Sequence, residues 1–240
     1  MVKFNNYTQT RVWPRSKGFA KKPMPYGGIP GPWVMIFNDE FRGGSLNQSI
    51  WAPNWFGEGG TMNNVATYKA NVSVGANGLA LLLPAAGQGS LISSNPNGGA
   101  ATGFQFSYGY LEAMVTFPVN NDWSSFWTDG QNWPITGEFD IAEPENQIMS
   151  VGNYHYTGPT TINDPSPIAG AMGTPHIFGL DWQPSQANFY IDGVLHHSIT
   201  GGIIVSSPQY IIFNHGATSP TDGTGAGSSV YVRYVRVWQH

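Results

Sequence analysis

The segment "WPITGEFDIAEPENQ", residues 133–147, places three carboxylic acids within six positions of a chain in which only 10% of residues are charged. The acids are Glu138, Asp140 and Glu143. Because side chains alternate faces along a strand, Glu138 and Asp140 share a face and Glu143 would point to the other. A β-bulge between Asp140 and Glu143 returns Glu143 to the first face. The spacing therefore predicts a row of three acids on one face of a strand.

Such a row of acids can hydrolyse a glycosidic bond. A retaining glycosidase uses an ionised carboxylate as the nucleophile and a protonated carboxyl as the acid, about 5 to 5.5 Å apart. A flat strand would separate residues 138 and 143 by roughly 16 Å, so the bulge, the sheet curvature and the long Glu side chains must shorten that distance. Nearby negative charge raises the pKa of the less well hydrogen-bonded acid, which keeps it protonated. An exposed acidic strand that only aids solubility is the alternative interpretation.

Three tryptophans, Trp123, Trp127 and Trp133, precede the acids within eleven residues. Flat indole faces suit the apolar C–H faces of sugar rings. Each of the three could equally belong to the core, but their position just before an acidic row favours sugar binding.

The elements that must position these residues are strands. From residue 33 onward, short apolar or alternating segments are bounded by Gly, Pro, Ser or Asn, with no helical period between them. "NVSVGANGLALLL" (71–83) predicts two strands around an Asn-Gly turn, and "YGYLEAMVTFPV" (108–119) alternates polar or aromatic residues with Leu111, Ala113, Val115 and Phe117. This pattern predicts an all-β protein whose antiparallel sheets pack as a sandwich.

Composition and charge restrict the possibilities further. The chain of 240 residues is long enough for one large domain, and no apolar run has the roughly 18 to 20 residues of a membrane span. There is no cysteine, hence no disulfide or thiolate site, and the N-terminus has no apolar core of the secretory kind, so no signal peptide is expected in this chain. Six of the ten cationic residues lie in the first 22. We predict a basic, Pro/Gly-rich arm (1–32) packed on a body (33–240) with too few cations to bind nucleic acid.

Five segments together resemble glycoside hydrolase family 16 over roughly residues 33–239. "GEFDIAE" is similar to the family signature E-x-D-x-x-E in the bulge-containing form of laminarinase-like enzymes. "FNDEFRGGSLNQSIW", "FSYGYLEAMVTFP", "TPHIFGLDWQPSQANFYIDG" and "VYVRYVRVWQ" are similar to its opening, inner, hairpin and closing segments. The resemblance implies a concanavalin-like jelly-roll β-sandwich of two curved antiparallel sheets, with substrate in a cleft on the concave sheet.

The resemblance also implies roles for individual residues. Glu138 would be the nucleophile, Glu143 the general acid and then base, and Asp140 the carboxyl that orients and tunes the nucleophile, with His155 supporting them from the adjacent strand. Trp127 and Trp133 match the tryptophans of the sugar subsite next to the cleaved bond. Further residues are expected to line the cleft from other strands or loops: Trp123, Trp55, Glu58 and His215. Ala142, small for its place in the bulge, is expected to widen the cleft floor.

The function that the resemblance implies is a secreted, monomeric, retaining endo-β-glycanase, most simply an endo-β-1,3-glucanase of the laminarinase kind acting on polysaccharide. A galactanase of the agarase, carrageenase or porphyranase type is an alternative, although sulfated galactans call for more cations than the four in residues 33–240. A non-catalytic carbohydrate-binding protein of the same fold and a transglycosylase are the others. No membrane or nucleic-acid partner is expected.

No cofactor or metal is expected to be required. Many family members carry an Asp in a closing segment similar to V-D-Y-V-R-V-Y, and that Asp binds a structural calcium. Here the segment is "VRYVRVW", which puts Arg233 at the ligand position. A guanidinium offers no oxygen ligand. We therefore expect the charge of Arg233 to replace calcium by pairing with an acid of the opening strand such as Glu40.

Overall fold

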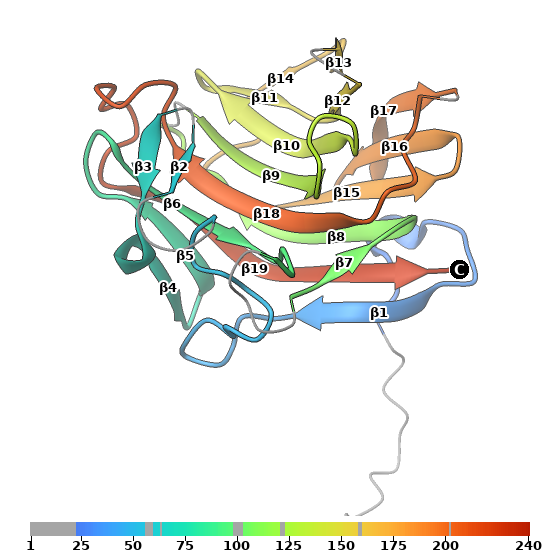
Figure 1. The fold of residues 1–240 in the computed structure, drawn as a ribbon, viewed down its shortest axis with the longest axis horizontal. Helices are drawn as coiled ribbons and strands as arrows, with labels where there is room; N and C mark the ends of the chain where they lie inside the picture. Colours follow the sequence, from blue (N-terminus) through green and yellow to red (C-terminus); the bar gives the residue numbers. More distant parts are fainter. Residues whose placement is uncertain are drawn as a thin grey trace, which may run out of the picture.

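The computed structural model describes residues 23–55, 60–62, 64–97, 103–120, 123–157, 160–201 and 203–240. Within these ranges the chain is built of strands, with two single 3-10 turns, η1 (Tyr26–Gly28) and η2 (Lys69–Asn71). The strands form two sheets that lie one above the other (Figure 1). Among the described residues, no helix has the length and apolarity needed to cross a membrane.

The lower sheet in Figure 1, which we call the outer sheet, has eight strands in the described part of the chain. Its order is β17 (Val194–Thr200), β16 (Gln186–Ile191), β15 (His176–Gln183), β8 (Gly109–Thr116), β19 (Ser228–Gln239), β5 (Gly78–Leu83) and β4 (Val72–Gly75), with β1 (Val34–Asp39) paired to β19. The predicted turn between residues 71 and 83 is confirmed as the β4–β5 hairpin, whose two loop residues are Ala76 and Asn77.

The second sheet, which we call the cleft sheet, has eleven strands over the same described ranges. Its order is β13 (Thr160–Ile162), β12 (Asn153–Tyr156), β10 (Glu138–Glu145), β9 (Trp123–Gly130), β18 (Gln209–Gly216), β6 (Gln88–Ser93), β3 (Val65–Thr67) and β2 (Thr61–Met62). Beside this path, β11 (Ile148–Ser150) pairs with β10 and β14 (Ile168–Ala169), and β7 (Gln105–Phe106) pairs with β18. The described strand pairs are antiparallel, as predicted, except β3 and β6, which pair in parallel.

The hydrophobic core fills the space between the two sheets. Leu111, Ala113, Val115 and Phe117 of the predicted alternating segment all belong to it, which confirms the period-two pattern. The other face of β8 is also covered, because Glu112 is fully buried and accepts a hydrogen bond of 2.8 Å from the backbone N–H of Tyr26.

The described end of the predicted basic arm, residues 23–32, lies against the outer sheet. Ile29 packs with Trp33, Tyr110 and Trp238 in a second apolar cluster, and the Trp238 indole N–H donates to the Pro23 carbonyl at 2.9 Å. Residues 1–22, with the six cations of the arm, lie outside the described residues.

The β-bulge predicted in the acidic segment is present in β10. The register of β10 against β9 shifts between Asp140 and Ala142, and Ile141 and Ala142 are both fully buried in the core. Two consecutive residues on the core face return Glu143 to the face of Glu138 and Asp140. The expectation that Ala142 widens the cleft floor is wrong, because its side chain points into the core.

Candidate active site

The acids of β10 stand in rows that cross the cleft sheet on its face away from the core. The first row contains one residue from each of four neighbouring strands, in register: Tyr210, Asp129, Glu138 and His155. The second row contains Ile212, Trp127, Asp140 and Asn153. Beyond the bulge, Glu143 pairs with Ser150 of β11. Directly opposed residues on one face have Cβ atoms roughly 4.5 to 5.5 Å apart, so the acids and their neighbours are in contact range.

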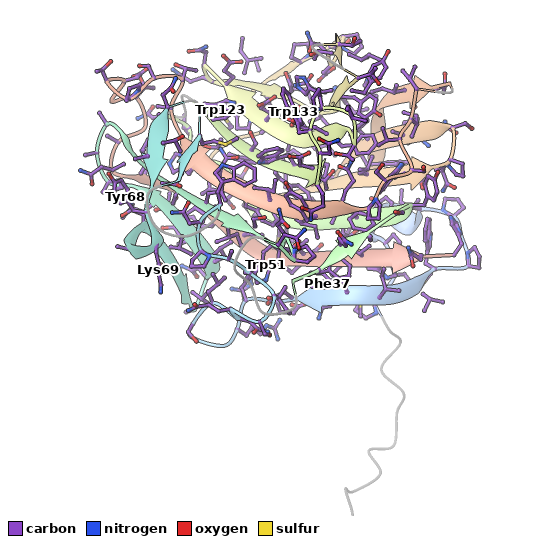
Figure 2. The ribbon with its side chains drawn as sticks, in the orientation of Figure 1. Phe37, Trp51, Tyr68, Lys69, Trp123 and Trp133 are labelled. Carbon is purple, nitrogen blue, oxygen red and sulfur yellow. The ribbon has the colours of Figure 1, made fainter. Side chains whose placement is uncertain are left out.

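A hollow of about 770 Å³, which we call the main hollow, lies over these rows. Glu138, Glu143 and His155 line it, and Asp140 lies beneath them with only 2% of its surface exposed. All four predicted tryptophans line it as well: Trp55, Trp123, Trp127 and Trp133. Figure 2 shows Trp123 and Trp133 on the upper side of the molecule, away from the labelled core residues Trp51 and Phe37.

The chain enters β10 through a turn that fixes the first acid. Gly137, directly before Glu138, has φ 76°, and a Cβ there would lie 2.7 Å from the Val205 side chain, so only glycine fits. The Gln209 amide donates to the carbonyls of Thr136 and Gly137 at 2.6 and 3.0 Å. These contacts fix the backbone of the turn and therefore the position of Glu138 on the cleft sheet.

The first two acids hold protons tightly. Burial, followed by the neighbouring Asp140 carboxyl, raises the pKa of Glu138 above its ordinary range. Burial, followed by Glu143, raises the pKa of Asp140 well above its ordinary value. The Nε2 atom of His155 lies 3.1 Å from Asp140 Oδ2, and its charge would oppose the rise at Glu138. Because the neighbouring carboxyls affect each other's ionisation, Glu138 and Asp140 titrate as a coupled pair.

Glu143 is instead fixed by hydrogen-bond donors. The Trp123 indole donates to Oε1 at 2.9 Å and the Asn153 amide donates to Oε2 at 3.0 Å. The backbone N–H of Asp164 donates to Asn153 Oδ1 at 2.8 Å, which sets the orientation of that amide. The Asp164 carboxylate in turn lies 2.9 Å from His196 Nε2. Sequence reasoning missed Asn153 and Asp164, and the only signal was that Asn153 stands two positions before His155 on the same face.

The expectation that His215 lines the cleft is wrong. Its side chain is fully buried, and its two ring nitrogens lie 2.7 and 2.9 Å from the hydroxyl oxygens of Ser124 and Ser228. Ser228 begins a strand of the outer sheet, so His215 joins the two sheets. The further expectation, that Glu58 lines the cleft, falls outside the described residues.

His215 should make the fold sensitive to acid. Burial lowers the pKa of His215 to about 4, from an ordinary value of 6.5. The unfolded chain therefore takes up this proton first, and stability is lost as pH falls from 6.5 toward 4, by up to about 3 kcal/mol. Urea unfolding of wild type and His215→Gln at pH 7 and pH 4 should show a loss of stability that is larger in wild type by about this amount. Equal losses in both proteins would contradict the assignment.

Arg233 and Glu40 have different partners in the structure. Arg233 donates to the Ala76 carbonyl at 2.7 Å, whereas Glu40 pairs with Arg236 and Arg42, so the predicted Arg233–Glu40 pair is wrong. A guanidinium at this position offers no oxygen ligand to calcium, so the absence of a structural calcium here stays a prediction. Among the described residues, Glu138, Asp140 and His155 have potential metal-ligand atoms within 4.8 Å of one another, but this group is the acid cluster itself.

Removing calcium should therefore leave the stability unchanged. We expect the melting temperature with 5 mM EDTA to match that with added calcium within about 1 °C, because a ligand that binds only the folded state would raise it. A calcium-dependent rise of several degrees in a thermal scan would overturn this expectation.

Fold and site together define a glycoside hydrolase. The chain belongs to the glycosyl hydrolases family 16, because the model of that family matches residues 59–210, more than half of its 240 residues. A glucan endo-1,3-beta-glucosidase of Cryptopygus antarcticus is 28% identical over 196 residues, covering 70% of each chain. A beta-glucanase of Bacillus subtilis (strain 168) is 29% identical over 191 residues, covering 74% of this chain and 73% of the other. The crystal structure of SCLam, a non-specific endo-beta-1,3(4)-glucanase, superposes with a TM-score of 0.71 at 23% identity and covers 91% of this chain and 94% of its own, a likeness that concerns the fold.

Proposed function

We propose that the protein is a retaining endo-β-1,3-glucanase that hydrolyses glucan of the laminarin kind. The observation that carries the proposal is that Glu138 and Glu143 line one tryptophan-walled hollow from one strand face. The activities named for the two relatives, a β-1,3-glucanase and a β-glucanase, support the same substrate class. A purely binding protein would not need two separately held carboxyls.

The mechanism is a double displacement. Glu138 attacks the anomeric carbon while Glu143 protonates the departing oxygen, which forms a glycosyl ester on Glu138 with inverted configuration. Glu143 then takes a proton from water, and the water attacks the ester with a second inversion. Asp140, beside Glu138, donates a hydrogen bond to Glu138 when that carboxylate is charged and takes part in its proton exchange as the ester forms and breaks. The Trp123 and Asn153 donors keep Glu143 aimed at the leaving oxygen.

The charge of the hollow favours a neutral glucan over a sulfated galactan. Its described lining contains acids, tryptophans and amides, but no lysine or arginine. Arg42 and Arg236 pair with Glu40, and Arg233 bonds to the β4–β5 hairpin, so these three are engaged elsewhere. Sulfate groups entering this hollow would meet carboxylates without compensating cations.

The same proposal covers the remaining features. The protein would act as a monomer and without a metal cofactor, since both catalytic groups come from one chain and neither needs a metal. Residues 33–240 would form the hydrolase domain, and 1–32 an arm on it. Polysaccharides of this kind lie outside cells, so we propose that the protein works in the extracellular space.

The pH profile of kcat/KM should be bell-shaped, with an acid limb above the ordinary pKa of a glutamate. Glu138 must be ionised to attack, and Asp140 is one of the causes that raise its pKa. In Asp140→Asn that cause is lost, so the acid limb should move to lower pH whatever happens to the maximal rate. A limb that stays in place, or a rate that is constant between pH 4 and 9, would contradict the assignment.

Reducing-sugar release from a panel of laminarin, curdlan, barley mixed-linkage glucan, agarose and κ-carrageenan tests the substrate. We expect release from laminarin or curdlan. Release only from agarose or κ-carrageenan would replace the glucan by a galactan. No sugar release from any polymer, together with retarded migration of the protein in affinity electrophoresis, would favour the carbohydrate-binding alternative.

A further inference from the structure

Asp129 is a fourth carboxyl on the cleft face, and the mechanism above gives it no task. It stands in β9 directly opposite Glu138 and lines the main hollow. It also lines a second hollow of about 430 Å³, which shares Trp55 and Trp133 with the first. Asp129 is thus at the junction of the two hollows, beside the residue that attacks the sugar.

The Asp129 carboxyl is buried but incompletely hydrogen-bonded. Only 6% of the residue is exposed, and the Tyr210 hydroxyl donates to Oδ2 at 3.2 Å. Oδ1 has no hydrogen-bond partner among the described residues. A carboxylate has about four acceptor positions, and native proteins rarely leave a buried one unused without a reason. Burial raises the pKa of Asp129 to about 7, although the Gly130 backbone N–H and the Tyr210 hydroxyl act in the opposite direction.

The surroundings indicate which donor is missing. The second hollow is lined by Trp55 and Trp133, by backbone at Gly60 and Gly130, and by uncharged polar side chains, with no cation in its described lining. Five acids line the main hollow, and the indole walls of both hollows suit the apolar faces of sugar rings. Sugar hydroxyls are neutral donors, and an unused carboxylate oxygen accepts such a hydrogen bond.

We propose that Asp129 binds a hydroxyl group of the sugar that lies at the junction of the two hollows, and so helps to set which sugar the enzyme accepts there. The inference rests on the proposed function. Because Glu138 attacks the anomeric carbon, the sugar that touches Glu138 belongs to the part of the chain that becomes the covalent ester. Asp129, its direct neighbour, contacts that sugar or the next one toward the second hollow. One carboxylate oxygen stays with Tyr210 while the other accepts the sugar hydroxyl.

The test measures binding without turnover. Titration calorimetry with laminaritetraose is done in the Glu138→Gln background, to which Asp129→Leu or Asp129→Asn is added. The titration is done above the raised pKa of Asp129, at about pH 8.5, where the carboxyl is ionised. Loss of a hydrogen bond to this charged acceptor should then weaken binding roughly 10- to 100-fold in the Leu variant. The Asn variant keeps an acceptor and should lose no more than roughly 10-fold. Glu40→Gln in the same background is the matched control, because it removes a carboxylate far from the cleft, where Glu40 pairs with Arg236, and should leave binding unchanged.

Single-deoxy tetrasaccharides identify the hydroxyl. One of these sugars should bind the Glu138→Gln parent weakly, and its affinity should not fall further when Asp129→Leu is added. The missing hydroxyl and the missing carboxylate would then be the two partners of one contact. Equal affinities of the parent and the Leu variant, or additive losses for every deoxy sugar, would overturn the inference and leave the proposed function standing. Failure of the parent itself to bind laminaritetraose would overturn the proposed function, and the inference with it.

Discussion

Glu138→Gln is expected to abolish hydrolysis of the glucan while leaving its binding largely intact. The amide keeps the size of the carboxylate and its place in the row, but it cannot form the ester with the anomeric carbon. Removing a catalytic nucleophile lowers kcat by roughly 10⁵-fold or more. The rate of reducing-sugar release and the affinity measured by calorimetry separate the two effects.

Glu40→Gln is the matched control for this variant. It makes the same chemical change on the outer sheet, where Glu40 pairs with Arg236, and it should leave kcat and KM unchanged. Residual hydrolysis by Glu138→Gln above about 1% of wild type, in a preparation free of deamidation, would remove Glu138 from the role of nucleophile.

Glu143→Ala is expected to separate the two chemical steps. Hydrolysis of polysaccharide should fall roughly 10²- to 10⁴-fold, because no acid protonates the leaving oxygen and no base activates water. A dinitrophenyl β-glucoside oligomer needs no protonation on leaving, so it should still form the ester on Glu138. Azide needs no general base either, and it should restore turnover by attacking that ester.

The stereochemistry of the rescue product distinguishes the roles of the two glutamates. Attack by azide on a Glu138 ester gives a β-glycosyl azide after two inversions. An α-azide would mean that azide displaced the leaving group directly, with a single inversion. That result would make Glu143, and not Glu138, the nucleophile. Trp123→Phe and Asn153→Ala, which remove one donor each from Glu143, should not be rescued, because they leave the carboxyl in place.

The sequence carried enough information to predict the acidic row, because it depends on spacing within one strand. Intervals of two and then three require an extra residue, and the structure confirms a bulge that buries Ile141 and Ala142 together. Three tryptophans were also predictable, since they stand just before the acids in sequence: Trp123, Trp127 and Trp133. All three line the main hollow.

The error at His215 could have been avoided from the sequence, because His215 shares a strand face with Ile211 and Phe213, which are both core residues. Contacts between distant strands, in contrast, were not predictable. The error at Arg233 has a different cause. The opening strand β1 pairs with β19 only as far as Asp39 opposite Val235, so the register brings Arg236 opposite Asn38, next to Glu40, and leaves Arg233 beyond the paired segment. Asn153 and Asp129 gained their places only from the pairing of β9, β10 and β12.

Covalent trapping tests the central claim, which is that Glu138 forms an ester with the sugar. The protein would be incubated with a 2-deoxy-2-fluoro laminari-oligosaccharide carrying a dinitrophenyl leaving group, which slows hydrolysis of the ester, and then digested for peptide mass spectrometry. We predict one added glycosyl mass per chain, on the peptide that contains Glu138 and on that side chain. A label on Glu143 or Asp140, or inverted products with no labelled protein, would contradict the account.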